Sequence, residues 1–275
     1  MFDLTNKVAF ITGAGQGMGA GIAEAMAHAG AKVIATGRSQ NVFETAERIG
    51  HGVEARLLDV SDEKMVAETA GDILKKYGHV DILVNNAGIM LPVDARTMES
   101  EIREKQYRIN VCGCWNCTRA FLPQMMEQSY GRIINLSSVT GPMVADSGMM
   151  AYAPTKGAIL AFTKALALEG APYNVTANSI LPGMIRSHMT AITANNNSRE
   201  DPEAFFQRVA KGIPMGRYGT AQEVGFLAAF LASDEAGYIT GAEIVIDGGH
   251  CLPETIALTG PYPLHSEPRY CYEDD

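Results

Sequence analysis

The chain has 275 residues, of which 47% are hydrophobic and 19% are charged, and this balance excludes a mainly disordered protein. Its length fits one large domain. Lys and Arg number 22 against 31 Asp and Glu, so the formal net charge is −9 and a nucleic-acid partner is not expected. The apolar run from Val224 to Ala232 is far shorter than the roughly 20 residues that span a bilayer, so we expect no membrane partner.

Five cysteines, an odd number, accompany an N-terminus without a basic segment before an apolar run. This combination predicts reduced thiols and a cytoplasmic location. Cys112, Cys114 and Cys117 lie close together in CGCWNC, with no histidine nearby. Three thiols on a helix are more typical of packing than of a zinc site, so no metal is expected.

Short β-branched runs alternate with longer amphipathic stretches along the chain. Repeated strand–helix–strand units predict an α/β fold, with a doubly wound parallel seven-stranded sheet and helices on both faces. The expected strands are 7–12, 32–36, 53–58, 82–84, 133–136, 174–177 and 242–246. The expected helices are 18–29, 40–49, 62–77 with Ser61 as its cap, 101–111, 116–128, 151–169 and 221–231.

Two regions interrupt this alternation. Residues 187–211 have no strand signal and are rich in Asn, Thr and Met, so we interpret them as a mobile insertion. The segment after the last strand carries four prolines and cannot form one continuous helix. We therefore predict a single domain over 1–250 and a C-terminal extension over 251–275.

The first strand leads into the glycine-rich sequence TGAGQGMG, and a helix follows at once. Glycines at this position allow a tight turn and let a pyrophosphate approach bare N–H groups at the helix N-terminus. A tight turn without a ligand is the alternative, but the strand before it and the helix after it favour a dinucleotide site. The residues expected to hold the cofactor here are Gly13, Gln16, Gly17, Met18 and Gly19.

The end of the second strand bears on the choice of cofactor. An acidic residue at this point hydrogen-bonds the adenosine ribose and selects NAD(H), but this chain has Gly37 followed by Arg38 and Ser39. The donors of an Arg side chain can pair with a 2′-phosphate. The sequence therefore predicts NADP(H) as the preferred cofactor and NAD(H) as the alternative; a merely solvated Arg38 is the competing interpretation.

Several motifs together resemble those of the short-chain dehydrogenase/reductase family over residues 5 to about 250. The glycine spacing G-x-x-x-G-x-G, the NNAG sequence at 85–88 and the pair Tyr152 and Lys156, four residues apart, carry this resemblance. Segments such as SSVTGPMVAD and LPET are similar to the UcpA-like oxidoreductases of the family. The resemblance implies a single-domain Rossmann fold and the catalytic tetrad Asn110, Ser138, Tyr152 and Lys156. It also implies cofactor contacts from Asp59, Val60, Asn86, Ala87, Gly88, Tyr152, Lys156, Pro182, Gly183, Ile185 and Ser187.

In this family the tetrad interconverts an alcohol and a ketone. Hydride transfer to a ketone leaves an alkoxide, which needs a proton donor within hydrogen-bond reach. Tyr152 would be that donor, and we expect the Lys156 ammonium to lower the pKa of its phenol. Ser138 would donate a hydrogen bond to the substrate oxygen, and Asn110 would hold a water that links Lys156 to solvent.

Methionines flank the expected substrate site. Met143 and Met149 precede Tyr152, and Met189 lies in the expected substrate lid near 187–212. Together with Ser138 they predict an apolar alicyclic alcohol or ketone, such as a steroid or bile acid, whereas ordinary core filling is the competing interpretation. A reductase of a small cyclic ketone or of a 3-oxoacyl thioester is the alternative enzyme, and a nucleotide-sensing regulator is the alternative class. The resemblance further implies a homotetramer or homodimer, in which the tail would reach a neighbour's cleft.

Overall fold

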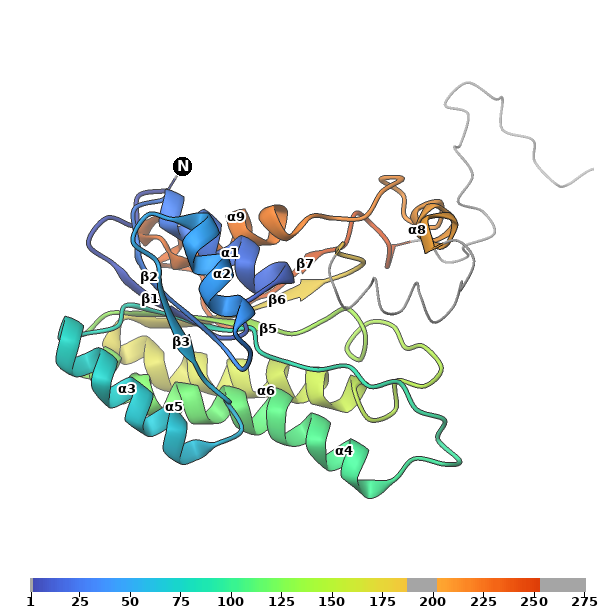
Figure 1. Cartoon of the computed structure of the whole chain (residues 1–275), viewed down its shortest axis with the longest axis horizontal. Helices are drawn as coiled ribbons and strands as arrows, with labels where there is room; N and C mark the ends of the chain where they lie inside the picture. The colour runs from blue at the N-terminus through green and yellow to red at the C-terminus, as the bar shows by residue number, and fades with distance from the viewer. Residues whose placement is uncertain (1, 187–201, 253–275) are drawn as a thin grey trace, which may run out of the picture.

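The computed structural model describes residues 2–186 and 202–252 and forms one parallel sheet with helices on both faces (Figure 1). The seven strands lie in the order β3-β2-β1-β4-β5-β6-β7. This confirms the α/β fold that the alternating pattern predicts. Their bounds are β1 (Val8–Ile11), β2 (Lys32–Gly37), β3 (Glu54–Leu57), β4 (Ile82–Asn85), β5 (Gly131–Leu136), β6 (Val175–Pro182) and β7 (Glu243–Ile246).

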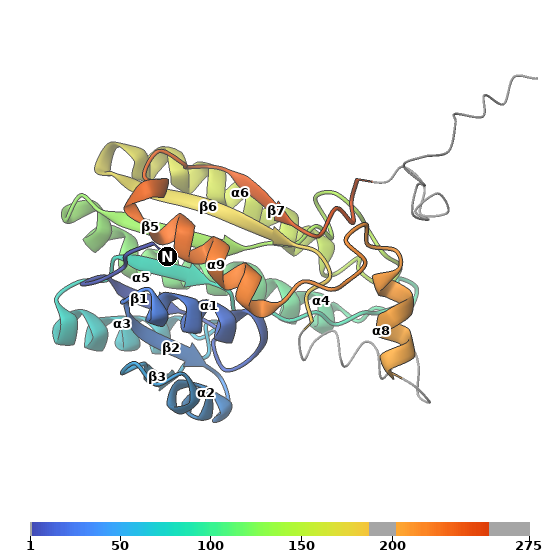
Figure 2. The same ribbon diagram turned by 90° about the horizontal axis from the view of Figure 1, so that it is seen from above.

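Two layers of helices enclose the sheet, as the two perpendicular views show (Figures 1 and 2). One face is covered by α1 (Gly17–His28), α2 (Asn41–Ile49) and α9 (Ala221–Ala232). The other is covered by α3 (Glu63–Tyr77), α4 (Ser100–Tyr107), α5 (Gly113–Glu127) and α6 (Ala153–Gly170). Within the described ranges, no helix is long and apolar enough to cross a membrane.

Each face of the sheet has its own apolar core. The strands β1, β4, β5 and β6 are buried along their whole length. This explains the continuous apolar sequences of β1 and of β4 up to Asn85. Ile22 and Met26 of α1 belong to the core on the α1 and α9 side. On the opposite face the rings of Phe10 and Phe121 pack with centroids 4.8 Å apart.

The structure corrects three expectations about local structure. The helix α3 is capped by Asp62, whose carboxylate accepts from Met65 N at 3.0 Å, because Ser61 instead donates to Asp59. The helices expected at 101–111 and 116–128 are one continuous stretch, since a π-helical turn over Arg108–Cys112 joins α4 to α5. The expected insertion contains a helix, α8 (Pro202–Ala210), and its residues 187–201 lie outside the described part.

The strand order creates a crevice at one end of the sheet. The chain runs outward from β1 to β2 and β3, then returns to place β4 on the other side of β1. The turns that follow β1 and β4 therefore diverge beyond the carboxyl ends of these two strands. Open parallel sheets bind ligands at such a reversal of strand order.

Candidate active site

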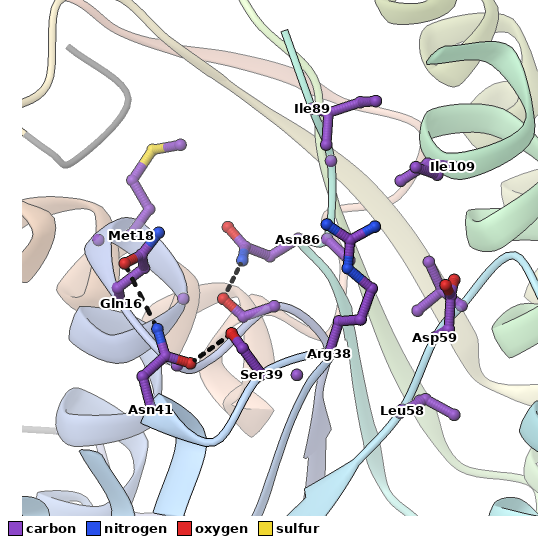
Figure 3. Close-up of a pocket in the computed structure, with 18 residues that line it drawn as sticks. Gln16, Met18, Arg38, Ser39, Asn41, Leu58, Asp59, Asn86, Ile89 and Ile109 are labelled. Carbon is purple, nitrogen blue, oxygen red and sulfur yellow. Dashed lines mark hydrogen bonds between the residues drawn. The ribbon is translucent and has the colours of Figure 1, made fainter. Parts of the chain in front are cut away.

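A groove lies at this reversal of strand order, where the turns after β1, β2, β3 and β4 meet (Figure 3). All twelve residues of these turns that the sequence predicts for the cofactor line it. They are Gly13, Gln16, Gly17, Met18, Gly19, Arg38, Ser39, Asp59, Val60, Asn86, Ala87 and Gly88. Sequence segments up to about 70 residues apart thus share one surface.

The glycine-rich turn is locked against the turn after β4. Gly13 has a φ of 66°, which lies in the left-handed region that favours glycine. A Cβ on Gly19 would overlap the Gly13 carbonyl oxygen, so that position also requires glycine. The Asn86 amide donates to Thr12 O at 2.9 Å and to Gly13 O at 3.0 Å. The NNAG sequence therefore holds the glycine-rich turn in place.

The N-terminus of α1 fits a phosphate group. Its cap residue Gln16 has extended backbone and makes no side-chain capping hydrogen bond. The first N–H groups of a helix have no partner within the helix, and the helix dipole adds partial positive charge there. Gln16, Gly17, Met18 and Gly19 all line the groove, so this end of the helix can hold the pyrophosphate of a dinucleotide.

The turn after β2 brings one cation to the groove. Arg38 is exposed, and its guanidinium extends across the groove between Asn86 and Asp59 (Figure 3). Burial acts to raise the pKa of Asp59, but hydrogen bonds from Ser61 and the charge of Arg38 outweigh it and leave this pKa below its usual value. Ser39 donates to Asn41 Oδ1 at 2.9 Å. The groove therefore holds a free guanidinium fork beside a polar cluster.

The predicted tetrad residues lie around the strand and helix that follow. Ser138 comes after β5, and Tyr152 stands immediately before α6, which carries Lys156. The side chain of Ser138 lies close to the phenol of Tyr152 and acts to lower its pKa. Lys156 Nζ lies 5.6 Å from the centroid of the Tyr152 ring and donates to Leu136 O at 2.8 Å. The other two protons of the ammonium remain for a bound ligand.

Burial dominates the acidity of this group of residues. It raises the pKa of Tyr152 to about 12, although the nearby hydroxyl of Ser138 acts in the opposite direction. Burial also lowers the pKa of Lys156 to about 8. The expected lowering of the Tyr152 pKa is not found, because desolvation dominates and Ser138, not Lys156, is the group that acts against it.

The amide group of Asn110 connects the segment after β4 to Thr155, which is the neighbour of Lys156 in α6. Its Nδ2 donates to Ile89 O at 2.9 Å and to Thr155 Oγ1 at 3.1 Å, and its Oδ1 accepts from Ile89 N at 2.8 Å. Both amide protons are thus used within the protein. A Cβ on Gly88 would lie 3.3 Å from Asn110 Oδ1 and 3.8 Å from Lys156 Nζ, so the groove continues directly to the tetrad.

Of the remaining predicted cofactor and substrate residues, the structure places some near the tetrad and leaves others outside the described residues. Pro182 O accepts from Val139 N at 3.1 Å, which places the end of β6 beside Ser138. Gly183 lies against Asp247, and Ile185 pairs with Gly219 in a short bridge. Met143 is exposed and Met149 half-buried on the loop between Ser138 and Tyr152. Ser187 and Met189 lie outside the described residues.

Sequence reasoning missed several residues of the groove. Asn41 lines it and donates to Gln16 Oε1 at 3.4 Å, and its position at the start of the helix after Arg38 was the available signal. Gly15, Gly37, Leu58, Ile89 and Ile109 also line it.

Cys112, Cys114, Cys117 and Cys251 are free thiols. Across residues 2–186 and 202–252, no group of three or more Cys, His, Asp or Glu side chains could hold a metal ion.

A nucleotide groove that opens onto a Ser–Tyr–Lys cluster defines the class of this protein as a Rossmann-fold oxidoreductase. The family model described as enoyl-(acyl carrier protein) reductase matches residues 13–250. The chain belongs to the short-chain dehydrogenase/reductase family, whose members use NAD(P)(H).

The comparisons with individual proteins agree with this assignment. Oxidoreductase UcpA of Escherichia coli K12 is 45% identical over 261 residues, which cover 94% of this chain and 99% of that protein. The 3-oxoacyl-[acyl-carrier-protein] reductase FabG of Aquifex aeolicus is 37% identical over 254 residues, 90% of this chain and 98% of that protein. The ligand-free aldohexose dehydrogenase of Thermoplasma acidophilum superposes with a TM-score of 0.86 at 30% identity, covering 92% of this chain and 97% of that one. Levodione reductase gives 0.85 at 29% identity, with 90% and 98% covered.

Proposed function

We propose that this protein is an NADP(H)-preferring enzyme that interconverts a secondary alcohol and a ketone. The observation that carries the proposal is the buried phenol of Tyr152, which lies close to Ser138 and to Lys156 at the end of the groove. When bound, the cofactor supplies the hydride for reduction and accepts it in oxidation.

Tyr152 is suited to act as the acid in the direction of reduction. With a pKa near 12 it stays protonated at neutral pH, and an alkoxide is a stronger base than a phenolate. Proton transfer from Tyr152 to the substrate oxygen is therefore favourable. Ser138 lies close to this phenol and so can donate a hydrogen bond to the same substrate oxygen.

Lys156 is suited to two tasks. Its ammonium is fixed at Leu136 O by one donor, so the other donors can hold the hydroxyls of a nicotinamide ribose, as the family resemblance implies. With a pKa near 8 it exchanges protons readily at neutral pH, so it can replace the proton that Tyr152 gives up through a ribose hydroxyl that bridges the two side chains.

The preference for NADP(H) rests on the turn after β2. Gly37 leaves no carboxylate where an NAD-selecting acid would stand, and the exposed guanidinium of Arg38 follows it. Asn41 and Gln16 add amide groups to the same wall of the groove. A 2′-phosphate would find one cation and several polar partners there.

The substrate that we propose is an apolar alicyclic ketone or alcohol, such as a steroid or bile acid. The loop between Ser138 and Tyr152 exposes Met143 and Met150, and Met215 is exposed after α8. Flexible thioether side chains adapt to bulky apolar molecules. The second candidate is reduction of a 3-oxoacyl thioester or small cyclic ketone, which the similarity to FabG and to levodione reductase favours.

Turnover of a panel of ketones tests this proposal. Purified protein is mixed with NADPH or NADH and steroids, cyclic ketones, sugars, quinones or a 3-oxoacyl thioester, and cofactor absorbance is followed. We expect consumption of NADPH with an alicyclic ketone. Turnover of the thioester alone would replace the first candidate with the second. Tight NADPH binding without turnover of any carbonyl would favour a nucleotide-sensing regulator instead.

The proposal also covers the cellular location and the oligomeric state of the enzyme. We propose a cytoplasmic homotetramer or homodimer that takes a small-molecule substrate. Light scattering during gel filtration measures the mass of the assembly, and a monomer at working concentration would contradict this part of the proposal.

A further inference from the structure

Two buried amide side chains on one helical stretch hold the chain segment that leaves β4. Gln106 is the last but one residue of α4 and is fully buried, and Asn110 lies one turn later in the π-helical turn with 3% exposure. Asn110 belongs to the predicted tetrad. Gln106 is not part of it, and the sequence analysis does not single it out.

The two amides bind the segment in the same way. Gln106 Oε1 accepts from Leu91 N at 2.9 Å, and its Nε2 donates to Leu91 O at 3.2 Å. Asn110 makes the corresponding pair of hydrogen bonds to Ile89 N and O, at 2.8 and 2.9 Å. Each amide thus satisfies the donor and the acceptor of one residue, as a neighbouring β-strand would.

The spacing explains why helix and segment match. Residues four apart in a helix rise by about 6 Å. Residues two apart in an extended chain are separated by about 6.6 Å. Side chains at 106 and 110 can therefore reach alternate residues of an extended segment, here 91 and 89, and replace a strand that the sheet does not supply.

The held segment joins the groove to the loop that carries the tetrad. Ile89 lines the groove. Val93 N donates to Gly148 O at 3.0 Å, and Gly148 precedes Met149, whose carbonyl accepts from Tyr152 N at 3.0 Å. Leu91 is midway between these two connections, and Gln106 is the side chain that ties it down.

We propose that Gln106 is a positioning residue for the reaction. By fixing Leu91 it holds the extended segment 89–93, and through Val93 and Gly148 it sets the place of the loop in front of Tyr152. Asn110 alone would fix the groove side of the segment and leave the substrate side free. This inference rests on the proposed function, because it assigns to Gln106 the placing of substrate against Tyr152.

The test compares three variants by steady-state kinetics and by hydrogen exchange. Gln106→Leu keeps the volume and removes both hydrogen bonds. Gln106→Glu keeps the acceptor and, when protonated, also the donor. Gln124→Leu is the matched control, because Gln124 Oε1 accepts from Val80 N at 2.9 Å before β4, at the end of the sheet away from the groove.

For Gln106→Leu we expect KM for the ketone to rise and kcat to fall. The combined loss in kcat/KM should be about 10- to 100-fold, because misplacing a reacting group by about 1 Å lowers the rate by about that factor. The Kd for NADPH should change by less than about threefold. Gln124→Leu should leave kcat/KM within about twofold. Gln106→Glu should recover activity relative to the native enzyme as pH falls and its carboxyl becomes protonated. Equal kcat/KM for the native enzyme and folded Gln106→Leu would overturn the proposal, as would equal losses in Gln106→Leu and Gln124→Leu or a Gln106→Glu variant without recovery.

Hydrogen exchange separates this inference from the proposed function. In Gln106→Leu the Leu91 amide should exchange at least tenfold faster, while the Ile89 amide stays protected by Asn110. This readout needs no substrate, so it stands even if no ketone is turned over. Unchanged protection of Leu91 would overturn the proposed placement of the segment by Gln106. If Gln106→Leu does not fold, both readouts are taken on Gln106→Glu across pH.

Discussion

Replacing Lys156 by methionine should make the protein more stable at neutral pH while abolishing turnover. Lys156 is 6% exposed, and burial lowers its pKa from 10.5 to about 8. At about 1.4 kcal/mol per pKa unit, the fold is destabilised by about 3 kcal/mol when this ammonium is charged. Methionine removes that cost but also the hydrogen bond from the charged ammonium to Leu136 O, which contributes about 2 kcal/mol. The net gain for Lys156→Met at pH 7 is about 1 kcal/mol.

The sign of this difference should change with pH. Between about pH 8 and pH 10.5 the folded protein binds fewer protons at Lys156 than the unfolded chain does, so native stability rises with pH in this window. Lys156→Met lacks the titrating group and shows no such rise. Near pH 10.5 the variant should be less stable than the native protein by about 1 kcal/mol, because only the lost hydrogen bond remains.

Urea unfolding followed by circular dichroism measures both curves at one protein concentration between pH 7 and pH 10.5. Other titrating groups are common to both proteins, so their contributions cancel in the difference between the two free energies of unfolding. A variant that is less stable than the native protein at pH 7, or a difference that does not depend on pH, would refute the argument from burial.

Two further substitutions test the groove. Arg38→Ala should lower kcat/KM for NADPH by about 10- to 100-fold and change it little for NADH, since a charge-assisted hydrogen bond contributes about 1.5–3 kcal/mol; equal effects on the two cofactors would assign Arg38 to the solvated surface. Gly19→Ala should destabilise the fold by about 1–3 kcal/mol and weaken NADPH binding measured by fluorescence, because its Cβ would overlap Gly13 O. Its control is Gly71→Ala in α3, where a Cβ meets nothing within 4 Å and the helix should gain about 0.5–1 kcal/mol; a Gly19→Ala variant as stable as Gly71→Ala would contradict the overlap.

The elements of the fold were predictable because their signals are local. The strand Val8–Ile11 reads as a continuous apolar run, and α1 has its apolar residues at helical spacing. The glycine-rich turn between them then locates the crevice from sequence alone. One local detail was not predictable: Ser61 and Asp62 are both good caps, and the hydrogen bond from Ser61 to Asp59, two residues earlier, leaves the cap to Asp62.

The finer features of the site depend on contacts between distant segments. The π-helical turn at Arg108–Cys112 has no periodicity of its own that would announce it. The pairing of Gln106 with Leu91 joins residues whose relation appears only when α4 packs beside the segment after β4. The pKa of Tyr152 likewise follows from burial, which spacing in a sequence does not reveal.

Turnover by the native protein and by Tyr152→Phe, with NADPH and the ketone panel, tests the central claim most directly. The account predicts that the native protein reduces at least one ketone. It predicts that Tyr152→Phe loses about 10²- to 10⁴-fold in kcat, while its affinity for NADPH, measured by fluorescence, is retained. Ketone reduction by Tyr152→Phe at the native rate would contradict the account, because the proton would then come from another group.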